Sequence, residues 1–199
     1  FINNIMHKNF ILASSSKSRL HMLKGVGLEF IQTPPNCNEE KIKKKLDKKN
    51  PKNFVKKLSF EKSKSISCQK KYRNKLVVGC DTVVVINNKI FDKAKNMKEA
   101  AEKIRQMSGK EHKIISGISI TKNGKLLWQD HETTKVIIRK LKEKQISNYL
   151  KKTGKQILNS VGCYQIEAAG PIIIENINGD FFNVMGLPVF KLLKYIYNK

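Results

Sequence analysis

Residues 75–89, KLVVGCDTVVVINNK, constrain the fold more than any other segment of the chain. β-Branched residues dominate this run, and it lacks the polar alternation of a strand with one face in water. The pattern predicts a central strand that is buried on both faces. Its end at Asn87-Asn88 indicates a tight turn. With 199 residues, the chain is long enough to build a substantial core around such a strand.

Strand and helix patterns alternate along the rest of the chain, with no internal repeat and no Pro/Gly/Ser-rich linker. Two hairpins are predicted, one with Asn123-Gly124 at its tip and one at 171–186 around Asn178-Gly179. Hairpins join antiparallel strands, so the sequence predicts an α/β fold with a mixed sheet. Helices are expected at 16–25, 39–49, 51–71, 96–107, 142–152 and from 188 onward, and further strands at 9–14, 27–33, 112–129 and 133–140.

Positive charge is in large excess, with 40 Lys and Arg against 16 Asp and Glu and a formal net charge of +24. Such a charge is typical of proteins that bind nucleic acids, anionic membranes or phosphate-rich small molecules. It is also typical of a chain rich in Lys, Asn and Ile whose lysines lie on solvated helix faces, as in EEKIKKKLDKKN at 39–50. The second interpretation is favoured for the bulk of the charge, and a few lysines in special positions are functional candidates.

The four cysteines are far apart and form no C-x-x-C pair, which argues against zinc or a disulfide framework and fits a cytoplasmic location. No apolar stretch approaches the length of a membrane span, and the start FINNIMHKNF is too short and polar for a signal peptide. We expect residues 1–8 to form a flexible N-terminal extension to a single domain at 9–199. Met6 is a candidate natural start, which leaves the origin of residues 1–5 open.

Asp81 is the first candidate for chemistry because it interrupts the buried strand. A carboxylate there is costly unless a cation, hydrogen-bond donors or a metal accompany it. It is either a structural aspartate satisfied by nearby donors or a functional one, and its context favours function. Gly79, two residues earlier on the same face of the strand, is expected to leave room for a ligand.

Lys62 lies on the apolar stripe of the helix predicted at 51–71, between Leu58 and Ile66. A lysine in this position either extends its ammonium group to solvent or reaches into a cleft toward an anion. The sequence leaves both outcomes open.

The segment LASSSKSR at 12–19 gathers hydroxyls and cations where a strand ends and a helix begins. Ser14, Ser16 and the free N–H groups of the helix start suit an anion, and Arg19 lies one turn into the helix. Taken alone, the serines are explained by ordinary helix capping, and the segment lacks the glycines and the G-K-[ST] ending of a P-loop.

Three weaker signals complete the set of candidates. Glu39 lies in a polar turn and is either a second functional carboxylate or an ordinary surface residue. Lys93 follows a strand, and His112 fits a structural role better than a catalytic one. The candidates together are carboxylates, lysines, an arginine and hydroxyls, with no evident nucleophile. This combination indicates metal-assisted phosphoryl or pyrophosphoryl chemistry, in which cations hold a polyphosphate and carboxylates hold a divalent ion and orient water.

A series of short motifs, in order from residue 12 to about 193, resembles the Maf family of nucleoside triphosphate pyrophosphatases, also called septum-formation-inhibitor-like proteins. Each motif is weak alone, and their order and spacing make the resemblance specific. Two of them depart from the usual pattern, since Lys17-Ser18 replaces Pro-Arg and Ala94 replaces a proline. The motifs are LASSSKSR at 12–19, NEE at 38–40, LSFEKS at 58–63, GCDTVV at 79–84, DKA at 92–94, MSGKEHKIISG at 107–117, GCYQIEAAG at 162–170 and NGDFFNVMGLPV at 178–189.

The resemblance implies a two-lobed fold similar to that of the inosine triphosphate pyrophosphatases, with a cleft around an elongated mixed sheet. It implies cleavage between the α- and β-phosphates of a nucleoside triphosphate, a divalent metal (Mg²⁺ or Mn²⁺) and a homodimer. Asp81 matches the proposed general base of the family, and Glu39 and Asp81 are the expected metal ligands. The residues expected to bind the triphosphate are Ser14, Ser16, Arg19, Lys62 and Lys93.

Three positions that sort substrates within the family hold Ser18, Thr82 and Glu167 here. Members that prefer dTTP and UTP carry Arg, Thr and Gln, and those that prefer 7-methyl-GTP carry an aromatic residue, Gln and Glu. The mixture suggests a modified or non-canonical nucleotide. The alternative is a basic nucleic-acid or cell-division-associated binding protein that keeps the fold without catalysis. Asp81, Lys62, Lys93 and Arg19 favour the enzyme.

Overall fold

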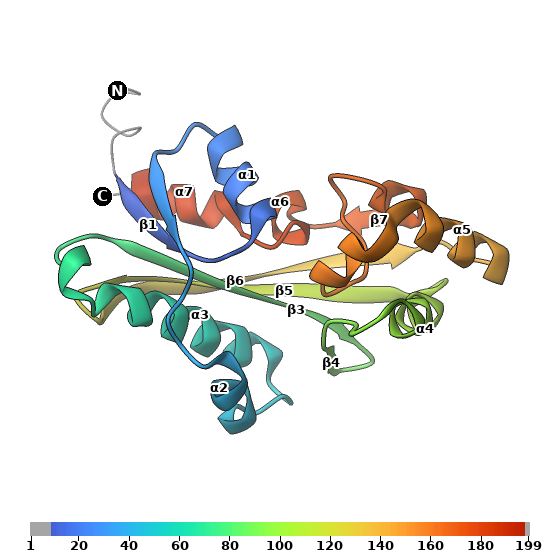
Figure 1. The fold of residues 1–199 in the computed structure, drawn as a ribbon, viewed down its shortest axis with the longest axis horizontal. Helices are drawn as coiled ribbons and strands as arrows, with labels where there is room; N and C mark the ends of the chain where they lie inside the picture. Colours follow the sequence, from blue (N-terminus) through green and yellow to red (C-terminus); the bar gives the residue numbers. More distant parts are fainter. Residues whose placement is uncertain (1–8, 198–199) are drawn as a thin grey trace.

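The computed structural model describes residues 9–197, which form a seven-stranded mixed sheet with helices on both faces (Figure 1). The strand order is β2-β1-β3-β5-β6-β7, and β4 also pairs with β3. The predicted fold class is therefore confirmed, while the extension predicted at 1–8 lies outside the described residues. The strands are β1 (Phe10–Ala13), β2 (Phe30–Thr33), β3 (Val77–Ile86), β4 (Lys89–Phe91), β5 (Glu111–Lys122), β6 (Lys125–Ile138) and β7 (Ile174–Asn178).

Strand β3 is the buried centre that its β-branched run predicts, and every side chain in it except Thr82 is buried. Strand β1 runs parallel to β3 on one side, and β5 runs antiparallel along the other. The tight turn at Asn87-Asn88 is confirmed, with φ of 49° and 60°, and it returns the chain as β4.

Helix α3 (Pro51–Ser67) covers one face of β3 and β5. Two glycines in the sheet allow the backbone of α3 to lie close to β3 and β5. A Cβ atom at Gly79 would lie 2.1 Å from the backbone oxygen of Ser59, and one at Gly117 would lie 2.4 Å from the backbone oxygen of Val55. The prediction that Gly79 leaves room for a ligand is therefore wrong, because the backbone of α3 fills that space.

Two groups of helices cover the opposite face of the sheet and form two lobes (Figure 1). The first group packs on β1 and the first half of β3. The second group packs on the last residues of β3, the start of β5 and the last residues of β6. Each lobe has its own apolar core. No helix within residues 9–197 is both long and apolar enough to cross a membrane. The first group is α1 (Lys17–Gly25), α6 (Phe181–Val184) and α7 (Val189–Tyr197), and the second includes α4 (Met97–Met107) and α5 (Glu143–Thr153).

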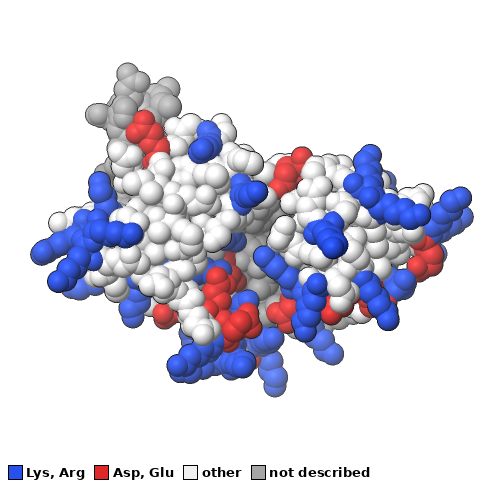
Figure 2. Space-filling view, in the orientation of Figure 1, with Lys and Arg blue, Asp and Glu red and all other residues white. Residues whose placement is uncertain are grey.

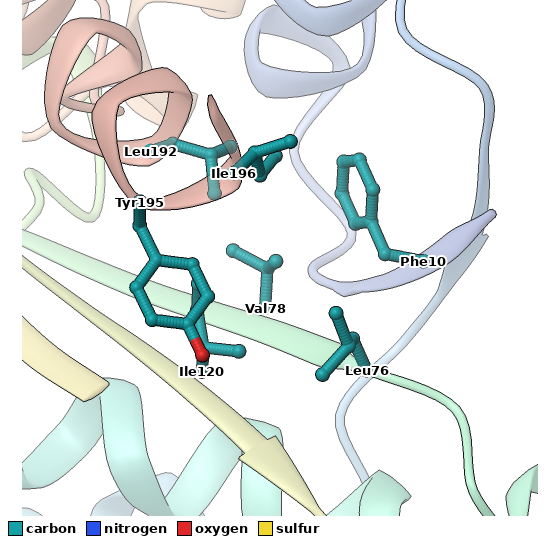
Figure 3. Close-up of a pocket in the computed structure, with 7 residues that line it drawn as sticks. All are labelled: Phe10, Leu76, Val78, Ile120, Leu192, Tyr195 and Ile196. Atoms are coloured by element: carbon teal, nitrogen blue, oxygen red, sulfur yellow. The ribbon is translucent and has the colours of Figure 1, made fainter. Parts of the chain in front are cut away.

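A small apolar cavity of about 20 Å³ lies between α7 and the sheet (Figure 3). It has no polar lining and is barely larger than one water molecule, so we regard it as a packing gap. The side chains around it are Phe10, Leu76, Val78, Ile120, Leu192, Tyr195 and Ile196.

The helices predicted at 39–49 and 51–71 end earlier, at Lys45 and Ser67. The structure also differs from the predicted strands in two places. Strand β6 is continuous across the break predicted between the hairpin arm at 112–129 and the strand at 133–140, although the turn at Asn123-Gly124 is confirmed. The hairpin predicted at 171–186 is wrong, because only β7 is a strand. The side chain of Asp180 accepts a hydrogen bond from the Phe182 backbone N–H at 2.8 Å and starts α6 where a second strand was predicted.

Candidate active site

The candidate site begins at a gap along one edge of β3. Strand β1 reaches Gly79 and β4 reaches back to Val84, so within the described chain residues 80–83 have no strand partner on this edge. The chain leaves both β1 and β4 at this gap, with Ser14 directly after one and Lys93 shortly after the other. The topology of the sheet therefore directs the ends of two strands toward the exposed edge of β3.

Asp81 and Lys62 form a buried ion pair at this gap, in which Lys62 Nζ donates to Asp81 Oδ1 at 2.6 Å. Glu39, the first residue of α2 (Glu39–Lys45), brings a second carboxylate whose Oε2 lies 3.0 Å from the same Nζ. Burial works to lower the pKa of Lys62, but the Asp81 and Glu39 carboxylates prevail and hold it above the ordinary value. Lys62 thus reaches toward anions in the cleft, one of the two outcomes left open by the sequence.

Glu39 and Asp81 are also the two expected metal ligands. Within residues 9–197, no group of three or more His, Cys, Asp or Glu is arranged to hold a metal ion. Mg²⁺, however, is usually bound by one or two carboxylates together with substrate phosphates and water. Two carboxylates that converge on one cationic nitrogen therefore fit a metal that shares its coordination with a phosphate substrate.

Arg19 joins three parts of the cleft wall. Its Nη1 donates to Ser14 Oγ at 3.2 Å and to the Cys80 carbonyl at 3.0 Å, its Nη2 donates to Thr82 Oγ1 at 3.1 Å, and its Nε donates to the Gly186 carbonyl at 2.7 Å. The Cys80 carbonyl lies in the gap of the sheet, so Arg19 supplies a donor where a strand partner is missing. These contacts use four of the five guanidinium N–H groups, which leaves one for a ligand.

The two predicted serines hold the start of α1. Ser16 caps the helix as predicted, with its Oγ accepting from the Arg19 backbone N–H at 3.3 Å. Ser14 is buried, and its Oγ accepts from the Ser16 backbone N–H and from the Arg19 side chain, both at 3.2 Å. Both oxygens are therefore occupied as acceptors, and what these serines can offer an anion is their hydroxyl protons.

Lys93 is the contrasting cation. Its side chain lies at the cleft, and within the described chain no carboxylate pairs with its ammonium group. Partial burial and then the positive charges of Arg19 and Lys62 lower the pKa of Lys93 below its ordinary value of 10.5. An anion that entered the cleft would relieve this repulsion.

The cleft has a volume of about 1210 Å³ and surrounds the gap in the sheet. Figure 2 shows the molecule hollowed between its two lobes, with acidic side chains gathered in the lower part of the hollow. Cations outnumber carboxylates along its walls, which suits a polyanionic ligand. The cations are Lys17, Arg19, Lys43, Lys44, Lys48, Lys62, Lys93 and Lys95, and the carboxylates are Glu39, Glu40, Asp81, Asp92 and Glu167.

The three predicted specificity positions fall into two groups. Ser18 Oγ donates to Glu167 Oε1 at 2.6 Å, which connects the start of α1 to the second lobe across the cleft. Thr82 lies apart from this pair, because its hydroxyl donates to the Gly186 carbonyl at 3.1 Å and contacts Ser116 Oγ at 2.8 Å.

Sequence reasoning missed the contribution of Gly186, whose carbonyl accepts from Arg19, Thr82 and the Cys80 thiol. Its φ of 103° is accessible to glycine at little cost, so a glycine directly before Leu-Pro was the available signal. His112, predicted to be structural, is buried and lies 2.6 Å from the hydroxyl of Tyr164, a residue of the cleft wall.

Known proteins resemble this chain over nearly its whole length. A family model described as Maf-like protein matches residues 9–199. A 7-methyl-GTP pyrophosphatase of Bartonella quintana (strain Toulouse) is 37% identical over 189 residues, covering 95% of this chain and 94% of the relative. A nucleoside triphosphate pyrophosphatase of Legionella pneumophila (strain Lens) is 33% identical over 195 residues, covering 98% and 95%. A dTTP/UTP pyrophosphatase of Thermoanaerobacter sp. (strain X514) is 38% identical over 184 residues, covering 92% of each chain. Since the family model matches nearly the whole chain, this protein belongs to the Maf-like protein family.

Proposed function

We propose that this protein hydrolyses a nucleoside triphosphate to a nucleoside monophosphate and pyrophosphate. The observation that carries the proposal is the cluster of buried Asp81 and Lys62 with half-buried Glu39, in a cleft that also presents Lys93, a cation with no carboxylate partner among the described residues. Three relatives with different substrate names are all pyrophosphatases of nucleotides, which supports the same reaction class here.

In the proposed reaction, water attacks the α-phosphorus. The new P–O bond forms as the bond from the α-phosphorus to the α–β bridging oxygen breaks, and pyrophosphate leaves with that oxygen. Asp81 accepts the proton that the water loses. Lys62, Lys93 and the remaining N–H of Arg19 neutralise the charge that develops on the phosphate oxygens, and the hydroxyls of Ser14 and Ser16 donate to them.

Glu39 and Asp81 are the proposed ligands of a divalent cation, Mg²⁺ or Mn²⁺. Carboxylates are in general weak bases at neutral pH. When bound, the metal lowers the pKa of water and offsets charge on the phosphates, which compensates for this weakness.

We propose that the substrate is a nucleoside triphosphate with a modified or non-canonical base. Glu167 is a hydrogen-bond acceptor that suits N–H groups of a guanine or the positive charge of a methylated one. Its pairing with Ser18 leaves this carboxylate without a full charge partner within the described chain. Thr82 instead matches the residue of the members that prefer dTTP and UTP, and its hydroxyl is engaged by Arg19 and the Gly186 carbonyl.

A pyrophosphate-release screen tests the proposed reaction. Ordinary and modified nucleoside triphosphates are supplied with Mg²⁺ or Mn²⁺, and we expect turnover of at least one nucleotide with a monophosphate as the second product. Release of inorganic phosphate alone would place the cleavage at the wrong bond and contradict the proposal. Glu167→Gln should change the ranking of bases while pyrophosphate release persists.

The net charge of +24 supports a second candidate function, binding to nucleic acids or to the cell-division machinery without catalysis. Absence of turnover on every nucleotide, together with tight and salt-sensitive DNA or RNA binding, would favour it. We further propose a cytoplasmic homodimer, in keeping with the family resemblance. Light scattering of the purified chain tests the dimer, and fractionation of cells tests the location.

A further inference from the structure

The Lys62 ammonium group lies between two carboxylates, 2.6 Å from Asp81 Oδ1 and 3.0 Å from Glu39 Oε2. We propose that Lys62 is a built-in counter-cation that excludes a divalent metal from this carboxylate pair in the free protein. The inference rests on the proposed function in one respect, since Glu39 and Asp81 are the metal ligands proposed above. It adds that the site is closed to the metal until Lys62 moves.

The first support is the way in which the two carboxylates meet. Glu39 lies at the start of α2 and Asp81 in the middle of β3, and the contact they share is the nitrogen of Lys62 on α3. Within the described chain, no other cation lies within 4 Å of either carboxylate. Two carboxylates in a partly dry site need a cation between them, and Lys62 supplies it.

The second support is competition for the same oxygens. A divalent metal requires carboxylate oxygens at its own coordination distance. With the ammonium group in place, Asp81 Oδ1 is occupied and a metal would also meet a fixed positive charge close by. Lysine and metal therefore cannot both hold the pair in its present arrangement.

The third support is that Lys62, unlike Arg19, is able to leave. Arg19 is fixed by four hydrogen bonds to three parts of the protein. Lys62 carries a point charge on a flexible four-carbon stem, and among residues 9–197 the polar contacts of its nitrogen are with the two carboxylates alone. Phosphate oxygens in the adjoining cleft would give it a new partner, so a phosphate substrate is the natural agent that opens the site.

Mn²⁺ binding to the nucleotide-free protein tests this without any activity measurement. Free Mn²⁺ is counted by its EPR signal during titration of the wild type, Lys62→Met and Lys57→Met. We expect Lys62→Met to bind Mn²⁺ about tenfold more tightly or better, since it loses a competitor and a repulsive charge. Lys57 lies exposed on the same helix, so Lys57→Met removes the same charge at a distance and should stay close to the wild type. Equal or weaker Mn²⁺ binding by Lys62→Met would overturn the proposal.

A second measurement uses the wild type alone, in case Lys62→Met does not fold. Amine acetylation is followed by peptide mapping with and without Mn²⁺. Because ammonium group and metal compete, Mn²⁺ at a concentration that the EPR titration shows to be bound should raise the rate at Lys62 several-fold and leave Lys57 unchanged; an unchanged or slower rate at Lys62 while Mn²⁺ is bound contradicts the proposal. Neither measurement involves a nucleotide, so failure of the pyrophosphatase screen and failure of this inference are separate results.

Discussion

Two buried polar pairs differ in charge: Lys62 with Asp81 between α3 and β3, and His112 with Tyr164 between β5 and the second lobe. Lys62 and Asp81 are both ionic, open onto the cleft and share a third partner in Glu39. His112 and Tyr164 are more deeply buried, at 2% and 3% exposure, and burial lowers the pKa of His112 to about 4 while raising that of Tyr164. The Nδ1 atom of His112 has no hydrogen-bond partner among the described residues.

The difference between the two pairs shows what decides the protonation state of a buried group. Desolvation opposes charge at both sites, and it prevails at His112 because the Glu111 carboxylate raises the pKa too weakly to offset it. At Lys62 the nearby carboxylates prevail over the same effect. We therefore expect substitutions in the ionic pair to lower activity and substitutions in the neutral pair to lower stability, and four experiments test this contrast.

Asp81→Asn should have the largest effect. Loss of the carboxylate removes the proposed base and one proposed metal ligand, so pyrophosphate release should fall about 10³-fold or more while the protein stays folded. Asp130→Asn is the matched control, because Asp130 pairs with Lys191 at 2.8 Å outside the cleft. Retained turnover in Asp81→Asn, measured with circular dichroism to confirm folding, would remove Asp81 from its role.

His112 should make stability depend on pH. The folded protein resists protonating His112 until about pH 4, whereas the unfolded chain takes up the proton near 6.5. The stabilisation is therefore complete above 6.5, declines as pH falls toward 4 and amounts to about 3 kcal/mol at most. Urea unfolding across this range should show a flatter profile for His112→Gln than for the wild type, and the exposed His21→Gln should not flatten it.

Gly79→Ala tests whether the ionic pair depends on the close approach of α3. The new methyl group would collide with the α3 backbone at Ser59, so the helix must move and unfolding free energy should fall by about 2 kcal/mol. Activity should fall too, because α3 carries Lys62. Gly25→Ala, with open space around the added Cβ, should change stability by less than about 0.5 kcal/mol. Equal stabilities of the two variants would refute the tight packing.

Lys93→Met should have the smallest of the four effects, an increase in KM of about tenfold from loss of one exposed cation. Lys93 must be charged to attract phosphate, and its pKa is lowered in the free protein. Wild-type KM should therefore begin to rise at a pH below 10.5, and the variant should lack this rise. Lys98→Met on the surface of α4 is the control, and an identical pH profile in Lys93→Met would exclude Lys93 from substrate binding.

The local features of the fold were predictable because they depend on neighbours in sequence. The β-branched run predicts β3, the asparagine pair predicts its turn, and the stripe of Leu58, Lys62 and Ile66 predicts the buried face of α3. The hairpin predicted at 171–186 is wrong for a related reason. The same few residues suit both a turn at Asn178-Gly179 and a helix cap at Asp180, and the local pattern does not choose between them.

Periodicity encodes which face of an element is buried, so the sequence alone placed a carboxylate on a buried strand and a lysine on a buried helix face. Three further features depend on the tertiary fold: Glu39 joins these two residues, β1 and β4 share one edge of β3 with a gap between them, and Gly79 faces a helix. The fold also places protein acceptors against most of the guanidinium N–H groups of Arg19. These contacts join residues far apart in the chain, and their partners follow from strand order and helix docking, which no local pattern specifies.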